Sequence, residues 1–324
     1  MYLVTGEPAQ GSLLEKAKIC LARCGLSFDP GAGFTAALME EDAVIATGSL
    51  DGGVIKCVAT LPEHQGEDLT GQIMTALLTR AAQEGRGHLM LYTKPRNQAM
   101  FTPFGFHPII RTPDVLLMEN KRRGLEDFLA SLPKPTDDSQ PVGCIVAHGN
   151  PFTRGHLYLV ETAAAQCAWV HLFILSEDRG MFPADARLAM AKAACAHLPN
   201  VLVHPTGPYM VSAATFPSYF LKETQSPAEV YCETDVRLFG EKIAPALGIT
   251  RRYVGTEPMC PVTAKYNAAM HRLLPEYGVA VTEVERRLSG DAPVSASRVR
   301  ALLAQGRTEE ARALVPDAVA SYIR

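Results

Sequence analysis

Residues 143–157 read GCIVAHGNPFTRGHL: an apolar, strand-like run ends in Gly, Asn, Pro and Thr, and a helix then opens with a Gly-His pair. Asn-Pro and Gly are ordinary turn formers, so this stretch alone is compatible with any strand that leaves its sheet. Similar runs follow, separated by segments with apolar residues at helical spacing. The runs begin at Cys144, Val170, Val201, Glu229, Arg251 and Val279. This alternation predicts a doubly wound, Rossmann-like α/β fold with a parallel sheet, whose ligands bind at the carboxyl ends of the strands.

The composition is that of an ordinary globular protein. Of the 324 residues, 47% are hydrophobic and 20% charged, and the formal net charge is -3, so we expect neither a nucleic-acid nor a membrane partner. The first residues, MYLVTGEPAQ, lack the basic and apolar regions of a signal peptide, and no apolar run reaches the roughly 18 residues that span a bilayer. The eight cysteines form no C-x2-C pair, so we expect reduced thiols and a cytoplasmic protein.

A change in composition divides the chain. Residues 121–141, KRRGLEDFLASLPKPTDDSQP, begin basic, contain one short amphipathic turn and end in a Pro, Asp and Ser cluster, which is typical of a linker. We therefore expect a smaller domain at 1–120, a linker at 121–141 and the parallel-sheet domain at 142–324. The smaller domain reads as mixed α/β, because the strand-like VIKCVAT at 54–60 precedes a helical stripe at 68–84 and another strand.

The turn after the first strand of the larger domain has the residues of a phosphate site. Thr153 and His156 are three apart, so they lie on one face of a first helical turn. Gly155 between them removes a Cβ from the surface that a ligand approaches. Free N–H groups and the helix dipole favour an anion there. A four-residue T-x-G-H pattern also occurs in turns with a surface histidine, so the motif needs a second one beside it.

That second motif lies near the end of the chain, in PVSASRVRALL at 293–303. Ser295 and Ser297 precede a helical run, Ser297 is the expected N-cap, and Arg300 follows three residues later on the same face. The alternative interpretation of this motif is a capped helix that binds no ligand. Hydroxyls and a guanidinium at a second helix start nevertheless predict a triphosphate held between the two motifs.

Together the two motifs resemble a known signature. N-P-F-T-x-G-H and V-S-A-S-x-V-R are similar to the T/H-x-G-H and I-S-x-S/T-x-x-R motifs of the nucleotidyltransferase superfamily, whose members attack the α-phosphate of ATP and release pyrophosphate. The stretches between them resemble the citrate (pro-3S)-lyase ligase family, and this resemblance covers nearly all of residues 142–302. It is carried by Phe182-Pro183 with Arg187, GPYMVSAATFPSYFLK at 207, TDVRLFGEKIAPALGIT at 234, RYVGTEP at 252 and TAKYN at 263.

The resemblance implies an AMP-forming acid-thiol ligase. In this family, acetate and ATP, with Mg²⁺, are used to acetylate the thiol of a CoA-derived prosthetic group on the acyl-carrier subunit of citrate lyase, through acetyl-adenylate. Carried over to the matching positions, it implies catalytic roles for Thr153, His156 and Arg300 and no protein ligand to a metal. It implies ATP-binding roles for Asn150, Phe152, Gly155, Arg187, Gly255, Ser295 and Ser297.

The smaller domain is similar to an acetyltransferase of the GNAT type, through the helix at 68–84 and the later NQAMFTPFGF. The pyrophosphate loop of that fold, R/Q-x-x-G-x-G/A, aligns with residues 65–70, where Asp68 and Thr70 stand in place of glycines. A carboxylate beside a pyrophosphate adds like-charge repulsion, so we expect this domain not to bind acetyl-CoA in the usual way. Holding the phosphopantetheine-type arm of the carrier and docking the partner protein remain open.

Three other functions compete with the ligase. An adenylyltransferase that acts on a phosphorylated coenzyme precursor shares both short motifs, but not the long stretches between them. A regulator that senses ATP would use the same phosphate groups without chemistry. An active acetyltransferase in the first domain is the third, and the missing glycines argue against it. A cysteine-based acyl relay is a rival mechanism, but no cysteine stands beside a histidine base in the sequence.

Overall fold

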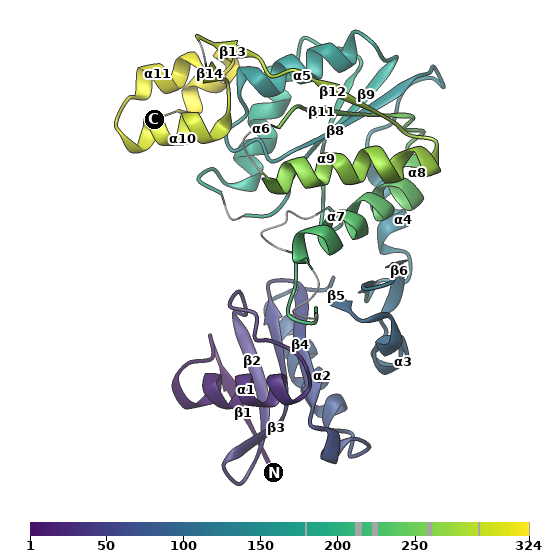
Figure 1. Ribbon diagram of the computed structural model, residues 1–324, viewed down its shortest axis with the longest axis vertical. Helices are drawn as coiled ribbons and strands as arrows, with labels where there is room; N and C mark the ends of the chain where they lie inside the picture. The colour runs from purple at the N-terminus through teal and green to yellow at the C-terminus, as the bar shows by residue number, and fades with distance from the viewer. Residues whose placement is uncertain (179, 211–215, 222–225, 258–260, 291, 324) are drawn as a thin grey trace. The chain divides into compact units, whose positions relative to one another are not determined.

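The computed structural model describes residues 1–178, 180–210, 216–221, 226–257, 261–290 and 292–323. The chain forms two compact units (Figure 1). The first comprises Met1–Gly124 and Phe216–Thr234, and the second comprises Leu125–Thr215 and Asp235–Arg324. Of the stretches that carry the family resemblance, residues 211–215, Lys222 and Pro258 lie outside the described residues. Among the described residues, no helix is both long and apolar enough to cross a membrane.

The first unit is built on a seven-stranded mixed sheet of order β1-β2-β3-β4-β5-β7-β6. Neighbouring strands are antiparallel, except that β4 and β5 are parallel. Its elements are β1 (Tyr2–Gly6), α1 (Gly11–Arg23), β2 (Phe34–Glu40), β3 (Ala43–Asp51), β4 (Val54–Thr60), α2 (Leu69–Gln83), β5 (Met90–Thr93), α3 (Gln98–Phe101), β6 (His107–Arg111) and β7 (Leu116–Glu119).

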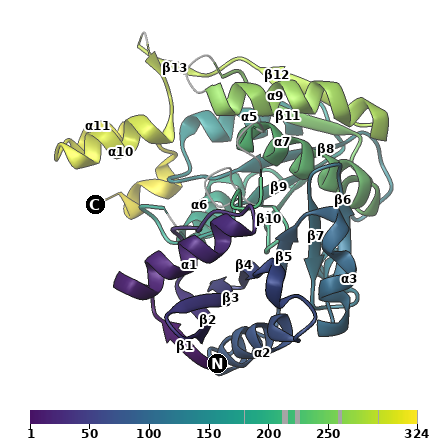
Figure 2. The ribbon, with the colours of Figure 1, turned by 60° about the horizontal axis from the view of Figure 1, so that its bottom comes forward.

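The core of the first unit lies on both faces of this sheet. Residues 34–39 of β2 are all buried, without the alternation of a half-exposed strand. Helices α1 and α2 account for this burial, because they lie on opposite sides of the strands (Figure 2). On the α2 side, Leu69, Ile73 and Leu77 enter the core at helical spacing, as the sequence predicted.

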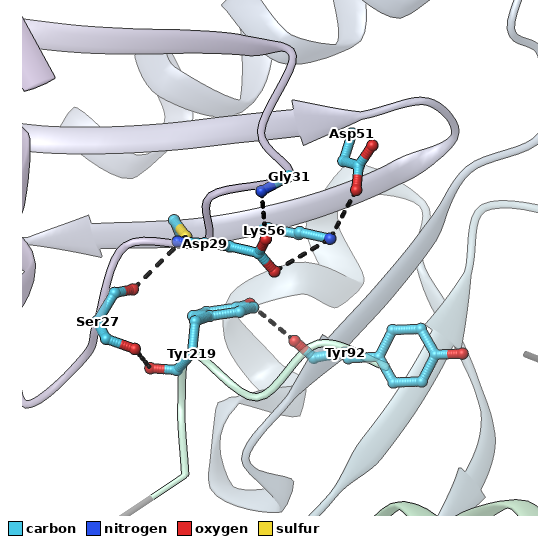
Figure 3. Close-up of polar contacts among 8 residues, drawn as sticks. Ser27, Asp29, Gly31, Asp51, Lys56, Tyr92 and Tyr219 are labelled. Carbon is cyan, nitrogen blue, oxygen red and sulfur yellow. Dashed lines mark hydrogen bonds and ion pairs between the residues drawn. The ribbon is translucent and has the colours of Figure 1, made fainter. Parts of the chain in front are cut away.

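Strands β4 and β5 separate after a short parallel contact. They pair at Val54 with Met90 and at Ile55 with Leu91, and Cys57 then adopts a left-handed backbone conformation with φ of 54°. Tyr219 fills the opening: its hydroxyl donates to the Tyr92 carbonyl at 2.9 Å (Figure 3). The gap between the two strands is therefore closed by a residue that is distant in sequence.

A buried ion cluster supports the same region. The Lys56 ammonium lies 3.1 Å from an Asp29 carboxylate oxygen and 2.8 Å from an Asp51 oxygen (Figure 3). Ser27, near Asp29 in sequence, donates its N–H to the Tyr219 carbonyl at 2.8 Å. The loop before β2 thus holds both the lysine and the Tyr219 segment, because each finds its polar partner there.

The second unit contains a five-stranded parallel sheet. Its main elements are α4 (Gly124–Ser131), β8 (Val142–Ala147), α5 (Arg154–Ala164), β9 (Trp169–Ile174), α6 (Ala184–Cys195), β10 (Val201–Pro205), α7 (Pro227–Leu238), a π-helical turn (Phe239–Ile243), α8 (Ala244–Ala246), β11 (Arg251–Gly255), α9 (Pro261–Leu273), β12 (Ala280–Val284), the short pair β13 (Leu288–Ser289) and β14 (Ala292–Pro293), α10 (Ala296–Ala304) and α11 (Thr308–Ala313). Gly124 of α4 and Pro227–Thr234 of α7 belong to the first unit.

The strand order β10-β9-β8-β11-β12 places β8 at the centre of the sheet, with parallel neighbours β9 and β11. In this order the chain turns from one side of β8 to the other, and ligands of doubly wound sheets bind at such a reversal. Ile145, Val170 and Leu172 pack with α5 and α6 on one face. The structure therefore confirms the expected mixed α/β fold with a parallel sheet.

The structure corrects two sequence expectations in this unit. EVYCET at 229–234 was expected to be a strand, but it lies inside α7. A capping-box helix start with proline at the first helical position is present in Ser226, Pro227 and Glu229. The strand-like pattern of the following residues obscured this helix signal. The N-cap of α10 is Ser295, whose hydroxyl accepts from the Arg298 N–H, and not Ser297.

The compact units also differ from the expected domain limits. Helix α4 lies wholly within residues 121–141, which the composition presented as a linker, and from Leu125 onward it packs with the second unit. Phe216–Thr234 lies within 142–324 in sequence but packs with the first unit. Such a return of the chain leaves no compositional signal, because it depends on contacts between distant residues.

The Tyr219 hydroxyl should stabilise the first unit measurably. Tyr219→Phe removes the donor to the Tyr92 carbonyl, and an unpaired buried polar group costs about 1–3 kcal/mol. We expect the free energy of unfolding in urea to fall by roughly this amount. Tyr2→Phe is the control, because the Tyr2 side chain is 56% exposed. Equal stability of the two variants would contradict the assigned hydrogen bond.

Candidate active site

The start of α5 is closed by a reciprocal pair of hydrogen bonds. Thr153 is the N-cap, and its hydroxyl oxygen accepts from the His156 N–H at 3.3 Å. The His156 ring in turn accepts from the Thr153 N–H through Nδ1 at 2.9 Å. This is a capping box in which histidine takes the place of the usual Glu or Gln. The two residues are therefore held together before any ligand binds.

The same bond sets the tautomer of His156. A backbone N–H can only donate, so Nδ1 must be the unprotonated ring nitrogen. In the neutral ring the proton then lies on Nε2, which becomes a donor. The His156 ring stacks on Phe152, with 5.3 Å between centroids. The ring is thus held in one orientation and offers one N–H.

Burial keeps His156 neutral. Desolvation, together with the charges of Arg286 and His148, lowers the pKa of His156 from 6.5 to about 4. Neutral imidazole still donates through Nε2, so the ring can bind a phosphate oxygen without being an acid at neutral pH.

Only part of the helix start is open to an anion. The Arg154 N–H already donates to the Leu314 carbonyl at 2.9 Å, and the His156 N–H donates to Thr153. Among the described residues, the Gly155 N–H has no acceptor. The anion site that the sequence predicted therefore reduces to one backbone N–H and the His156 ring.

The two motifs meet through Gly155. A Cβ on this residue would lie 2.6 Å from the Val294 carbonyl oxygen, a distance that a real side chain cannot adopt. Val294 directly precedes the N-cap Ser295 of α10. Gly155 is therefore required for the close approach of the second motif, in addition to exposing backbone to a ligand.

Polar contacts complete the second motif. The Ser295 and Ser297 hydroxyls lie 3.0 Å apart. Arg300, one turn later, donates from Nη1 to the Asn150 carbonyl at 2.6 Å. Arg300 thus connects α10 to the turn after β8 and still leaves guanidinium N–H groups for a ligand.

A cavity of about 440 Å³ opens where the motifs meet. Most of the expected site residues line it. These are Thr153, Gly155, His156, Gly255, Ser295, Ser297 and Arg300. Gly255 ends β11, and a Cβ there would meet nothing within 4 Å, so its backbone borders open space.

Three expected ATP-binding residues do not line this cavity. Phe152 is fully buried in the core under α5. The Asn150 side chain accepts from the Phe182 N–H at 3.0 Å. Arg187 is fully buried and donates to the carbonyls of Phe182, His148, Leu175 and Glu177. Asn150 and Arg187 order the loops around the site, because their polar groups are bonded to backbone.

Sequence reasoning missed other cavity residues. Arg286, just after β12, donates to the Thr256 carbonyl at 2.6 Å and pairs with Glu257. Arg252, on β11, and Tyr266, on α9, also line the wall. Arg252 and Tyr266 lie in RYVGTEP and TAKYN, which carried the family resemblance, and the sequence signal for Arg286 was Glu-Arg-Arg at 285–287, directly after a strand-like run. Among the described residues, no group of three or more His, Cys, Asp or Glu side chains has the geometry to hold a metal ion.

Comparison with known proteins assigns the chain to a family. Residues 142–323 match the family model of the citrate lyase ligase C-terminal domain. Curated citrate (pro-3S)-lyase ligases are 41% identical over 288 residues in Klebsiella pneumoniae and 40% over 291 in Escherichia coli K12. The alignments cover 87% and 88% of this chain and 84% and 83% of those proteins. The chain belongs to the citrate lyase ligase family. The expected family and the expected enzyme class, a ligase, are thereby confirmed.

Solved structures resemble parts of this citrate lyase ligase family member. An acyl-CoA N-acyltransferase from Pseudomonas aeruginosa is 14% identical, with 37% of this chain and 100% of that chain covered and a TM-score of 0.33. Thermotoga maritima TmcAL with bound alpha-thio ATP is 14% identical, with 56% and 55% covered and a TM-score of 0.37. Both TM-scores are below 0.5, and the assignment rests on the family model and the curated relatives.

Gly155 should tolerate no side chain. In Gly155→Ala the Cβ would push Val294 away, so we expect the affinity for ATP to fall at least about tenfold, a change of roughly 1.4 kcal/mol. Calorimetric titration with ATP would measure it. Gly87→Ala is the matched control, because a Cβ there meets nothing within 4 Å. Unchanged ATP affinity in Gly155→Ala would contradict the role of this contact.

The histidine should remain neutral well below pH 6.5. Its pKa of about 4 in the folded protein lies below the value of about 6.5 in the unfolded chain. The unfolded chain therefore binds the proton first as the pH falls. The stability that His156 contributes is complete above pH 6.5 and is lost as the pH decreases toward 4. An NMR titration, assigned with His156→Asn, should show neutral His156 at about pH 5; a midpoint near 6.5 would contradict the burial argument.

Proposed function

We propose that this cavity activates acetate with ATP and that the acetyl group then passes to the thiol of the CoA-derived prosthetic group on the citrate lyase acyl-carrier subunit. The single observation that carries the proposal is the convergence of two motifs on one cavity. His156 Nε2 and the Gly155 N–H come from one side, and Ser295, Ser297 and Arg300 come from the other.

The first step is adenylyl transfer. An acetate oxygen attacks the α-phosphorus of ATP, the bond from that phosphorus to the bridging oxygen of the β-phosphate breaks, and acetyl-adenylate and pyrophosphate form. The protein supplies no covalent nucleophile in this step. Its contribution is to position the reactants and to stabilise charge on the phosphate oxygens.

The residues divide this work. His156 Nε2 and the Gly155 N–H donate to oxygens of the α-phosphate, where charge develops. Thr153 acts through His156, because its N–H and hydroxyl hold the ring. Ser295, Ser297 and Arg300 bind the leaving pyrophosphate. Mg²⁺ enters with the triphosphate as part of the substrate, as is usual for a cation that keeps phosphate and water ligands.

The second step needs the carrier. Its thiol attacks the acetyl carbon, the bond from that carbon to the phosphate oxygen breaks, and AMP leaves while the thiol proton passes to solvent. The products are the acetylated carrier and AMP. We place the reaction in the cytoplasm, without nucleic-acid or membrane partners.

Acetate-dependent exchange of labelled pyrophosphate into ATP, with Mg²⁺ and without carrier, tests the first step. Exchange that requires acetate would support the ligase. Exchange that requires a phosphorylated acceptor would support the adenylyltransferase. ATP binding with no pyrophosphate release, even after thiol-bearing carrier is added, would leave the ATP-sensing function.

The variant His156→Asn tests the catalytic role of His156. The asparagine side-chain oxygen can still accept from the Thr153 N–H, but the Nε2 donor is lost. We expect the exchange rate to fall about 10²-fold or more, as for loss of a transition-state hydrogen bond, with little change in stability. His197→Asn is the control, because His197 is exposed and outside the cavity. An unchanged rate in His156→Asn would remove His156 from the catalytic residues.

A further inference from the structure

A buried guanidinium forms part of the cavity wall on β11. Arg252 is 3% exposed, lies next to Cys144 of β8 in the sheet register, and lines the cavity. Its Nη1 donates to the Cys144 sulfur at 3.2 Å, and its Cζ lies 4.7 Å from the centroid of the Phe239 ring. These contacts hold the guanidinium in place, but neither neutralises its charge.

No carboxylate pairs with Arg252 at ion-pair distance among the described residues. Asp235, on α7, is the nearby acid, and it accepts a hydrogen bond from the Tyr266 hydroxyl instead. Burial raises the pKa of Asp235 to about 6, although Tyr266 and Arg252 both lower it. The buried Nε–H of Arg252 has no hydrogen-bond partner.

An incompletely paired buried guanidinium is costly to fold, because its charge is removed from water without full compensation. A bound anion would reduce this cost, and a carboxylate fits a guanidinium through parallel hydrogen bonds. The phosphate-binding groups of the cavity come from α5 and α10. Arg252 comes from a different element, so it extends the polar wall beyond the two phosphate motifs.

The wall beside Arg252 also offers apolar surface. Tyr266 and Met270 are one helical turn apart on α9, and both line the cavity. Val254, two residues after Arg252 on β11, lines it as well. A guanidinium beside such side chains suits a small acid with a charged head and a short aliphatic tail.

We propose that Arg252 binds the carboxylate of the acid substrate and selects a short monocarboxylate such as acetate for attack on ATP. This assignment rests on the proposed function and deepens it. Arg252 accepts no proton and forms no covalent bond. It holds one carboxylate oxygen so that the other is free to attack the α-phosphorus.

Arg252→Gln tests the assignment. We expect the KM for acetate in pyrophosphate exchange to rise roughly 10- to 100-fold, as for loss of a charged hydrogen bond, while the Kd for ATP stays within about threefold. Arg252→Lys keeps the charge but loses the planar fork, and we expect an intermediate KM. Arg251→Gln is the matched control: Arg251 is adjacent, donates to the Gln166 carbonyl and is absent from the cavity wall.

The KM pattern separates substrate binding from a structural role. A rise in the acetate KM confined to the Arg252 variants supports the assignment. Equal losses for ATP and acetate, or a KM unchanged in both Arg252 variants, would overturn it. If Arg252→Gln does not fold, Arg252→Lys is judged by the same two constants.

Saturation-transfer NMR with acetate and a non-hydrolysable ATP analogue reads binding without turnover. If wild-type protein binds acetate but shows no exchange, and the acetate signal is weaker in Arg252→Lys, the proposed reaction is contradicted and the carboxylate site is retained. Exchange in wild type with an equal acetate signal in Arg252→Lys would retain the reaction and overturn the role of Arg252.

Discussion

The close approach of Gly155 to the Val294 carbonyl is the constraint on which the site depends. These residues are 139 positions apart in sequence, and even one methyl group between them would overlap backbone. The contact sets the N-cap of α10 beside the first turn of α5. It also places Arg300 where it can donate to the Asn150 carbonyl. The cavity therefore results from two helix starts that pack against each other without intervening side chains.

At this pair of helix starts, hydrogen bonding determines which ring nitrogen of His156 can donate to a ligand. Its Nδ1 accepts from a backbone N–H, so the remaining ring nitrogen is a donor, and burial keeps the ring neutral. A neutral donor can stabilise a phosphate oxygen without exchanging a proton with the substrate. The guanidinium of Arg187, by contrast, is buried and donates to four backbone carbonyls. An arginine that resembles a phosphate ligand in sequence can thus be a structural group.

Two features of the first unit differ from the acetyltransferase pattern that its sequence resembles. Asp68 lies at the start of α2 in a left-handed conformation, with φ of 54°, and its carboxylate covers Gly71. An anion at a helix start occupies the place that a pyrophosphate would need. Tyr219 in addition fills the opening between β4 and β5. The expectation that this unit does not bind acetyl-CoA in the usual way stays a prediction.

The sequence by itself determined the strand-helix alternation, the parallel sheet, the family and most of the cavity-lining motif residues, because periodicity and turn chemistry are local and the motifs are contiguous. It assigned EVYCET to a strand, since a short segment with three apolar residues at its centre has no unambiguous period. Only the tertiary structure decided that Tyr219 packs in the first unit, that Arg187 serves the fold and that Arg252 faces the cavity. Each of these depends on which partners the fold brings to a polar group, and those partners are distant in sequence.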